Sequence, residues 1–217
     1  MSKVRFANLE LDCSYTGPPI MEHGIDWYVD ADFVEMGGHV ITEYNRLLGY
    51  PYVETVSYTR CSLERPAALG ESYYINLDEI ASPTSLLGFL AAPRSRYSCR
   101  EISFANCDGL SPEVLHMLAM PLTDMDIWLS PNIAGLIIEG CKHFRSSDLR
   151  ILIEARRTVH EATGFLQDYD VGYVVTSITE LDVQDCCELA PDDREWFDAN
   201  VENVRWDDWT GGYDSGY

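Results

Sequence analysis

The chain is short of positive charge and of long apolar runs. Its 217 residues hold 15 Lys and Arg against 36 Asp and Glu, a formal net charge of −21. So negative a chain repels phosphate groups, which argues against nucleic acid and against an anionic membrane as partners. A basic protein remains a permitted partner. No apolar run reaches the roughly 18 residues that a membrane-spanning helix needs, so no membrane association is expected.

The sequence also lacks the short motifs that accompany common chemistries. It contains no Gly-x-Ser-x-Gly, no P-loop and no Gly-x-Gly-x-x-Gly. Its seven cysteines form no Cys-x-x-Cys pair, and an odd count argues against a disulfide framework. We therefore predict no catalytic residue, no cofactor and no metal site.

Neither the first residues nor the asparagines point to secretion. Residues 1–12 include two acids and no long apolar stretch, so they do not resemble a secretory signal. No Asn-x-Ser/Thr glycosylation acceptor occurs anywhere. A cytoplasmic or nuclear location is the expectation that follows.

What the sequence does contain is enough apolar material for a folded core. It is 46% hydrophobic and 12% aromatic, and its length suits one domain. We expect that domain to span residues 1–206. Residues 207–217 are acidic and Gly-rich and have no apolar period, so this segment is predicted to be a disordered tail.

A recurring frame organises the chain. It consists of an apolar residue, any residue, an apolar residue, any two residues and a cysteine. Two apolar residues at a period of two predict a short strand with one buried face. The small cysteine would then point inward where the chain leaves the strand. The frame ends at Cys61, Cys107, Cys141 and Cys186, with a looser version at Cys13.

A helix is predicted after each of the last three frames. The expected helices cover residues 111–119, 146–157 and 190–200. Ser111 is a suitable N-cap, and Pro112 and Pro191 suit the first helical turn. Apolar residues recur in the first two segments at helical spacing. The pattern therefore alternates short strands with helices.

The spacing between the cysteines predicts further units. The intervals are 48, 46, 34 and 45 residues, and three of them are about twice a leucine-rich repeat of roughly 20–29 residues. We expect intervening strands at 25–29, 74–77 and 172–175, with helices at 33–48 and 83–90. A further strand is expected at 125–129. Together these make roughly eight strand-plus-helix units.

The predicted fold is an α/β leucine-rich-repeat solenoid of irregular units, curved, with short parallel strands alternating with helices. A doubly wound α/β fold is the alternative, because it too alternates strands and helices. That fold favours longer apolar strands and usually a Gly-rich loop, which this chain lacks.

Residues 136–150 and 178–206 carry a resemblance to a known family. With their repeated Cys frames, residues 100–206 resemble the leucine-rich repeats of F-box proteins, above all the F-box/leucine-rich-repeat-like proteins of mushroom-forming fungi. Residues 1–99 resemble more degenerate repeats. The resemblance implies the substrate-recognition part of a ubiquitin-ligase receptor. Residues 1–60 show no F-box, so docking to a Skp-type adaptor would need an F-box supplied elsewhere.

The concave sheet of such a solenoid is its usual binding surface. We expect this chain to be a non-enzymatic protein-binding module that uses side chains between and just after each buried apolar pair. Their mildly acidic mixture favours a polar or basic protein epitope. The alternative is a soluble α/β enzyme with a deep pocket of converging polar groups. The expected binding residues are Ser57, Thr59, Ser103, Ala105, Ile137, Glu139, Asp182 and Gln184.

Overall fold

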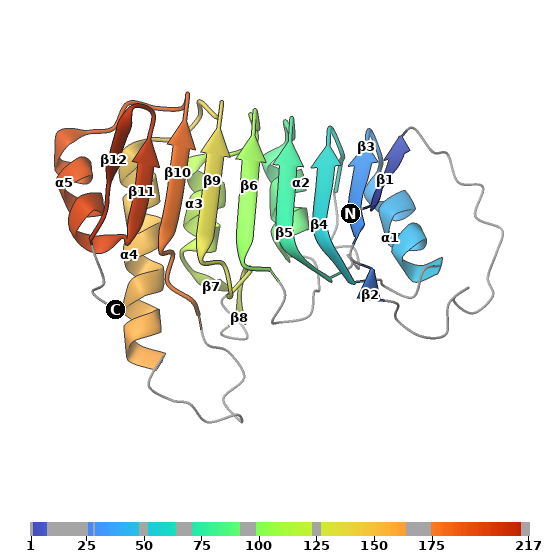
Figure 1. Ribbon diagram of the computed structural model, residues 1–217, viewed down its shortest axis with the longest axis horizontal. Coiled ribbons are helices and arrows are strands. Elements are labelled where there is room, and N and C mark those ends of the chain that lie inside the picture. The colour runs from blue at the N-terminus through green and yellow to red at the C-terminus, as the bar shows by residue number, and fades with distance from the viewer. Residues whose placement is uncertain are drawn as a thin grey trace.

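A computed structural model of the protein describes residues 2–7, 26–27, 29–47, 52–63, 71–91, 99–122, 127–163 and 175–213. They form an α/β structure in which one long sheet lies in front of a layer of helices (Figure 1). The helices are α1 (Gly38–Leu47), α2 (Pro83–Ala91), α3 (Pro112–Leu118), α4 (Ser146–Thr163) and α5 (Pro191–Asn200). The strands are β1 (Ser2–Ala7), β2 (Asp26–Trp27), β3 (Val29–Val34), β4 (Tyr52–Thr59), β5 (Glu71–Asp78), β6 (Glu101–Ala105), β7 (Pro121–Leu122), β8 (Ile127–Trp128), β9 (Gly135–Glu139), β10 (Glu180–Gln184), β11 (Asn203–Trp206) and β12 (Trp209–Gly211).

The main sheet is open, and its strands follow the order of the chain. Within the described residues it has ten strands in the order β1-β3-β4-β5-β6-β9-β10-β11-β12, with β2 beside β4. All neighbours are parallel except β11 and β12. A doubly wound sheet reverses its strand order and carries helices on both faces. This sheet keeps the strand order of the chain. Helices α2, α3 and α4 lie behind the same face (Figure 1).

Alternating burial explains why the short strands form a single sheet. In β6, Ile102 and Phe104 are fully buried and the residues between and beside them are half-exposed. The register places these two beside Leu136 and Ile138 of β9. The same inward pair recurs from β4 to β11, so the helix-facing side of the sheet is a continuous apolar layer.

Each strand of the main sheet from β3 to β11 is followed by a residue with a left-handed backbone. These are Glu35, Arg60, Glu79, Asn106, Gly140, Asp185 and Asp207, with φ between 47° and 66°. Except at Asp185 and Asp207, the N–H of each such residue donates to the last carbonyl of a neighbouring strand, as from Asn106 to Glu139 at 2.8 Å, and that of Asp207 donates to Val183 within β10. Asp185 donates instead to the Asp207 carboxylate. These hydrogen bonds tie successive strand ends together along one edge of the sheet.

The framed cysteines follow these turns and form a ladder of their own. The Cys107 thiol lies 3.2 Å from the carbonyl oxygen of Leu77 in the preceding strand and 3.3 Å from that of Ala105. Cys61, Cys141 and Cys186 make the equivalent contact with the preceding strand. A small side chain with a weak S–H donor therefore suits a buried bend where carbonyl groups converge.

The helices predicted from local signals are confirmed. Helix α3 begins after Ser111 with Pro112 at its first position. Helix α4 begins at Ser146, where the Asp148 carboxylate accepts a hydrogen bond from the Arg145 N–H at 2.8 Å. Predicted helix 83–90 corresponds to α2. Pro112 and Pro191 thus mark the starts of α3 and α5 correctly. The Ser111 hydroxyl, by contrast, makes no capping hydrogen bond.

The structure corrects two of the predicted intervening units and leaves a third largely outside the described residues. Phe33 and Val34 belong to β3, where Phe33 is buried two residues after Ala31, so the helix expected at 33–48 begins only at Gly38. Ile127 and Trp128 form β8, which pairs antiparallel with β7 outside the main sheet. Val175 belongs to no strand, and the rest of the strand expected at 172–175 lies outside the described residues, as does the Cys13 frame.

The tail prediction is also wrong where the chain is described. Trp209–Gly211 forms β12, which pairs antiparallel with β11 after a turn at Asp207. The Arg194 guanidinium lies 5.0 Å from the centre of the Trp209 ring, and the Gly212 N–H donates to Asp198 at 2.9 Å. Contacts with α5 therefore order a segment that lacks any local apolar period. Residues 214–217 lie outside the described residues.

Candidate binding face

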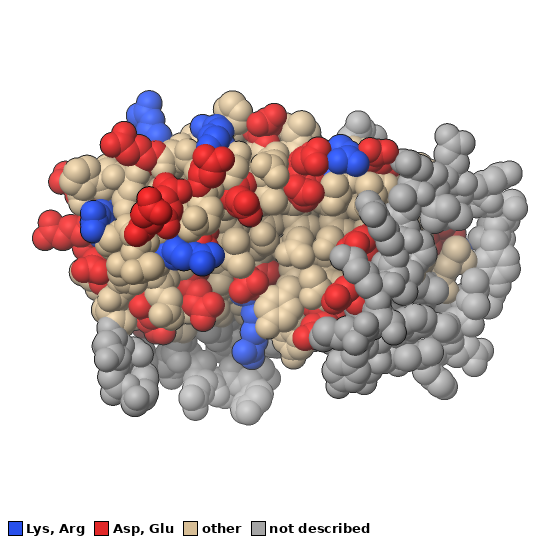
Figure 2. Space-filling view, turned by 45° about the horizontal axis from the view of Figure 1, so that its top comes forward, with Lys and Arg blue, Asp and Glu red and all other residues tan. Residues whose placement is uncertain are grey.

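The sheet face opposite the helices carries all eight predicted binding residues. Ser57, Ser103, Ile137 and Asp182 lie in one central row, with Asn76 between Ser57 and Ser103 and Arg205 after Asp182. Nearer the strand ends, a second row contains Thr59, Ala105, Glu139 and Gln184. Their common face is confirmed; binding by them stays a prediction. Figure 2 shows this face together with the edge at the strand ends, where Asp and Glu side chains are spread among few Lys and Arg.

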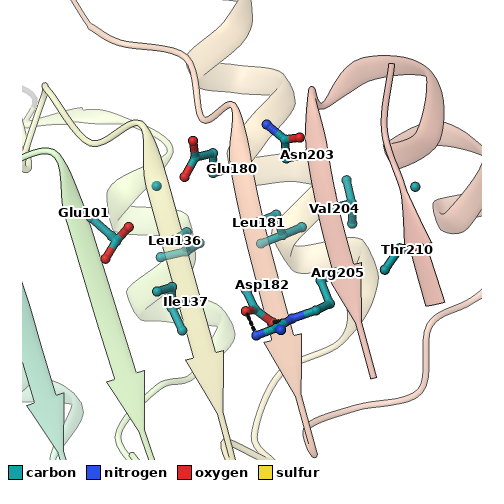
Figure 3. A pocket seen from close by; sticks show the side chains of 12 residues that line it. Glu101, Leu136, Ile137, Glu180, Leu181, Asp182, Asn203, Val204, Arg205 and Thr210 are labelled. Carbon is teal, nitrogen blue, oxygen red and sulfur yellow. Dashed lines mark hydrogen bonds and ion pairs between the residues drawn. The ribbon is translucent and has the colours of Figure 1, made fainter. Parts of the chain in front are cut away.

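A shallow, open hollow of about 510 Å³ lies on this face over β6, β9, β10, β11 and β12. Figure 3 shows its side chains, which combine acidic, amide and apolar groups. Of the eight predicted residues, only Ile137 and Asp182 line it. The lining residues not predicted from the sequence are Glu101, Gly135, Leu136, Glu180, Leu181, Asn203, Val204, Arg205, Thr210 and Gly211.

Gly135 lines the hollow beneath the side chain of Glu101. It lies in register between Glu101 on β6 and Glu180 on β10. A Cβ at this glycine would meet the Glu101 side chain at 3.1–3.2 Å, so the Glu101 side chain occupies the space above the glycine. Partial burial and the nearby charge of Glu180 both raise the pKa of Glu101 above its ordinary value. Two neighbouring carboxylates therefore share this end of the hollow.

An ion pair closes the other end of the hollow. The Arg205 guanidinium contacts both carboxylate oxygens of Asp182, one of them at 3.0 Å from Nε (Figure 3). The Gln184 amide also donates to Asp182 at 3.0 Å. Asp182 is thus already neutralised within the fold. Of the two acids expected to attract a basic epitope, Glu139 is the more exposed and Asp182 the less available.

The sequence held a signal for the missed residues. Glu101, Gly135, Glu180 and Asn203 each come directly before the first apolar residue of their unit. The expected binding set included only positions between and after the apolar pair. Aligning the frames one residue earlier would have placed a glycine between two glutamates.

Three of the described cysteines, Cys61, Cys186 and Cys187, are weak nucleophiles in this setting. Burial raises the pKa of both Cys186 and Cys187 to about 11, and burial likewise raises that of Cys61. A thiol attacks as its thiolate, and a raised pKa lowers the thiolate fraction at neutral pH. The adjacent pair at 186 and 187 is unbonded, both thiols being free.

Slow alkylation of Cys186 and Cys187 is therefore expected. A pKa two units above the ordinary value lowers the thiolate fraction at pH 8 by about 100-fold. Iodoacetamide should accordingly modify the peptide containing both cysteines about 100-fold more slowly in the native protein than in urea. Mass spectrometry of quenched samples measures both rates. Equal rates in the two states would contradict the burial of these thiols.

Neither sequence nor structure comparison adds to this description. No family model, curated protein or solved structure matches the chain. Across the described ranges, no helix has the length and apolarity to cross a membrane. The same residues contain no cluster of three or more His, Cys, Asp or Glu placed to hold a metal ion.

Proposed function

We propose that the protein is a non-enzymatic protein-binding module built as an irregular leucine-rich-repeat solenoid. The observation that carries the proposal is the sheet face that none of the described helices covers, which has polar side chains in register and a shallow hollow. Chain-ordered parallel strands, helices on a single face and the cysteine ladder support the repeat interpretation. In repeat proteins such exposed sheets bind extended protein surfaces.

The resemblance of residues 100–206 to F-box leucine-rich repeats suggests a more specific role. We infer that the module recognises substrates for a ubiquitin ligase. In that role the open face would hold the substrate, and an F-box on the same or another chain would contact the Skp-type adaptor. Location in the cytoplasm or nucleus belongs to the same proposal.

An open-face variant tests the binding role. Ser103→Arg combined with Ile137→Arg places two bulky charges on neighbouring strands in the middle of the face. Capture of partner proteins from cell extract should fall by about tenfold or more, because charge and bulk at the centre of an interface disrupt it most. Quantitative mass spectrometry of the captured proteins measures the loss.

A helix-face variant provides the matched control. Ile151 on α4 is 54% exposed on the helix layer, so Ile151→Arg adds a comparable charge away from the open face. Its captured proteins should match those of the unaltered chain. Capture of a Skp-type adaptor and cullin by the unaltered chain, and their retention by the open-face variant while other proteins are lost, would support the ligase role. Identical capture by both variants would contradict binding through the open face.

A further inference from the structure

A row of side chains crosses the open face one position before each buried apolar pair. The register is Tyr74 on β5, Glu101 on β6, Gly135 on β9, Glu180 on β10 and Asn203 on β11. Because Gly135 has no side chain, the Glu101 side chain lies over it, 3.1–3.2 Å from where a Cβ would stand. In Figure 3 the Glu101 and Glu180 side chains lie on the two sides of β9. Glu101, Gly135, Glu180 and Asn203 all line the hollow.

The two glutamates have no cation of their own. In the part of the chain that the structure describes, Glu101 and Glu180 take part in no ion pair, and the nearby Arg205 is held by Asp182. Like charges beside each other on a sheet are unfavourable, as the raised pKa of Glu101 reflects. This pair of carboxylates therefore does not stabilise the fold. A bound cationic ligand, in contrast, would be attracted by both of them.

The groups around Glu101 and Glu180 suit a long cationic side chain. Tyr74 is 41% exposed and adjoins Glu101 in the register, so its ring can attract a cation at the edge of the site. Ile137 lies on the same face beside Gly135 and lines the hollow, where it offers an apolar contact for an aliphatic stem. The aromatic ring, the two carboxylates and the apolar contact together suit the side chain of a lysine or an arginine.

We propose that the hollow over Gly135 binds the cationic side chain of a lysine or arginine in an extended segment of a partner protein. This inference rests on the proposed binding role and names the chemistry of its partner. Charge complementarity identifies the occupant, because the hollow presents two carboxylates that pair with no cation among the described residues, on a chain of net charge −21. The flat face around it accommodates the rest of an extended segment.

A pair of peptides tests the proposal directly. The first is the acetylated and amidated heptapeptide Ser-Thr-Ser-Lys-Ser-Thr-Ser, and the second carries Nε-acetyl-lysine instead of lysine. Each is titrated into the isotope-labelled full chain, and NMR follows the Gly135 amide and the side-chain carboxyl carbons of Glu101 and Glu180. The lysine peptide should shift all three signals. Acetylation should weaken binding by about tenfold, because it removes the charge from the hydrogen bond.

Two variants separate the site from general acidity. Glu101→Gln with Glu180→Gln should abolish the preference for the lysine peptide. Glu154→Gln, on the exposed side of α4, removes an acid far from the hollow and should leave the preference unchanged. Since ionised Glu101 is disfavoured in the fold, Glu101→Gln alone should melt at the same temperature as the unaltered chain or higher. Lost binding by the double variant, with the melting temperature maintained, therefore reports the site itself.

Equal binding of the two peptides, or shifts confined to other parts of the chain, would overturn the cation site. That failure is distinguishable from failure of the binding role. If Ser103→Arg with Ile137→Arg still abolishes capture of partners, the open face binds proteins by other chemistry. If that variant captures the same proteins as the unaltered chain, the binding role itself is contradicted.

Discussion

Replacing Arg156 with alanine is expected to lower the free energy of unfolding by about 3–5 kcal/mol, as removal of a buried charged partner commonly does. Arg156 on α4 is completely buried, and burial lowers its pKa to about 10, so it stays charged at neutral pH. Among the described residues no carboxylate pairs with it. Its guanidinium donates instead to backbone carbonyls, at 2.7–3.5 Å, of Leu118, Leu129, Ser130, Pro131 and Thr176.

These carbonyls explain why the loss should be large. They come from the end of α3, from the segment after β8 and from the segment before β10, so one side chain joins three separate stretches to α4. Alanine would leave several buried acceptors without this donor and would open a cavity as well. The effect should therefore exceed that of a simple core truncation in the same helix.

Equilibrium unfolding in urea, followed by circular dichroism, measures the change. Arg157→Ala is the matched control, because Arg157 is 38% exposed and pairs with Glu161 on the surface; its loss should stay within about 1 kcal/mol. Arg156→Met separates packing from hydrogen bonding, since methionine fills space without donating. Full stability in the methionine variant would show that the carbonyl contacts contribute little.

Local patterns predicted much of the alternation of strands and helices. A period of two before a cysteine identified β4, β6, β9 and β10, and proline and serine positions identified the starts of α3 and α4. Both signals act over a few residues, so neither needs knowledge of the rest of the chain. The full frame also occurs around β3 and β5, where Met36 and Ile80 replace the cysteine. A frame defined by its cysteine does not include these two units. The bend requires a buried side chain at that position, and cysteine is only one residue that provides it.

The remaining features depend on contacts between distant segments. Strand β12 is ordered by α5, and Arg156 finds its partners far away in sequence. The hollow requires a register that aligns Glu101, Gly135 and Glu180 on three different strands. Composition and local period hold no information about such alignment. The predicted binding residues do share one face, but ten of the twelve residues that line its hollow were not among them.

Gly88→Ala is expected to lower the free energy of unfolding by about 2–3 kcal/mol, although alanine favours helices over glycine by about 1 kcal/mol. Gly88 is buried in the middle of α2, where a Cβ would lie 2.3 Å from the carbonyl oxygen of Leu63. A backbone atom cannot move aside as a flexible side chain can. The Ser85 hydroxyl, one turn earlier, accepts a hydrogen bond from the Leu63 N–H at 3.2 Å and fixes the same contact.

The sign of this change in the free energy of unfolding shows how closely α2 packs against the turn after β4. Helix α2 must approach the turn after β4 with its backbone, so an added methyl group would push the two apart or distort the turn. Gly37→Ala is the matched control, because its Cβ would meet only the His39 side chain at 3.5 Å or more, and its stability should not fall. Urea unfolding of both variants measures the difference. A stabilised Gly88→Ala protein would mean that helix propensity outweighs packing and that α2 lies farther from Leu63.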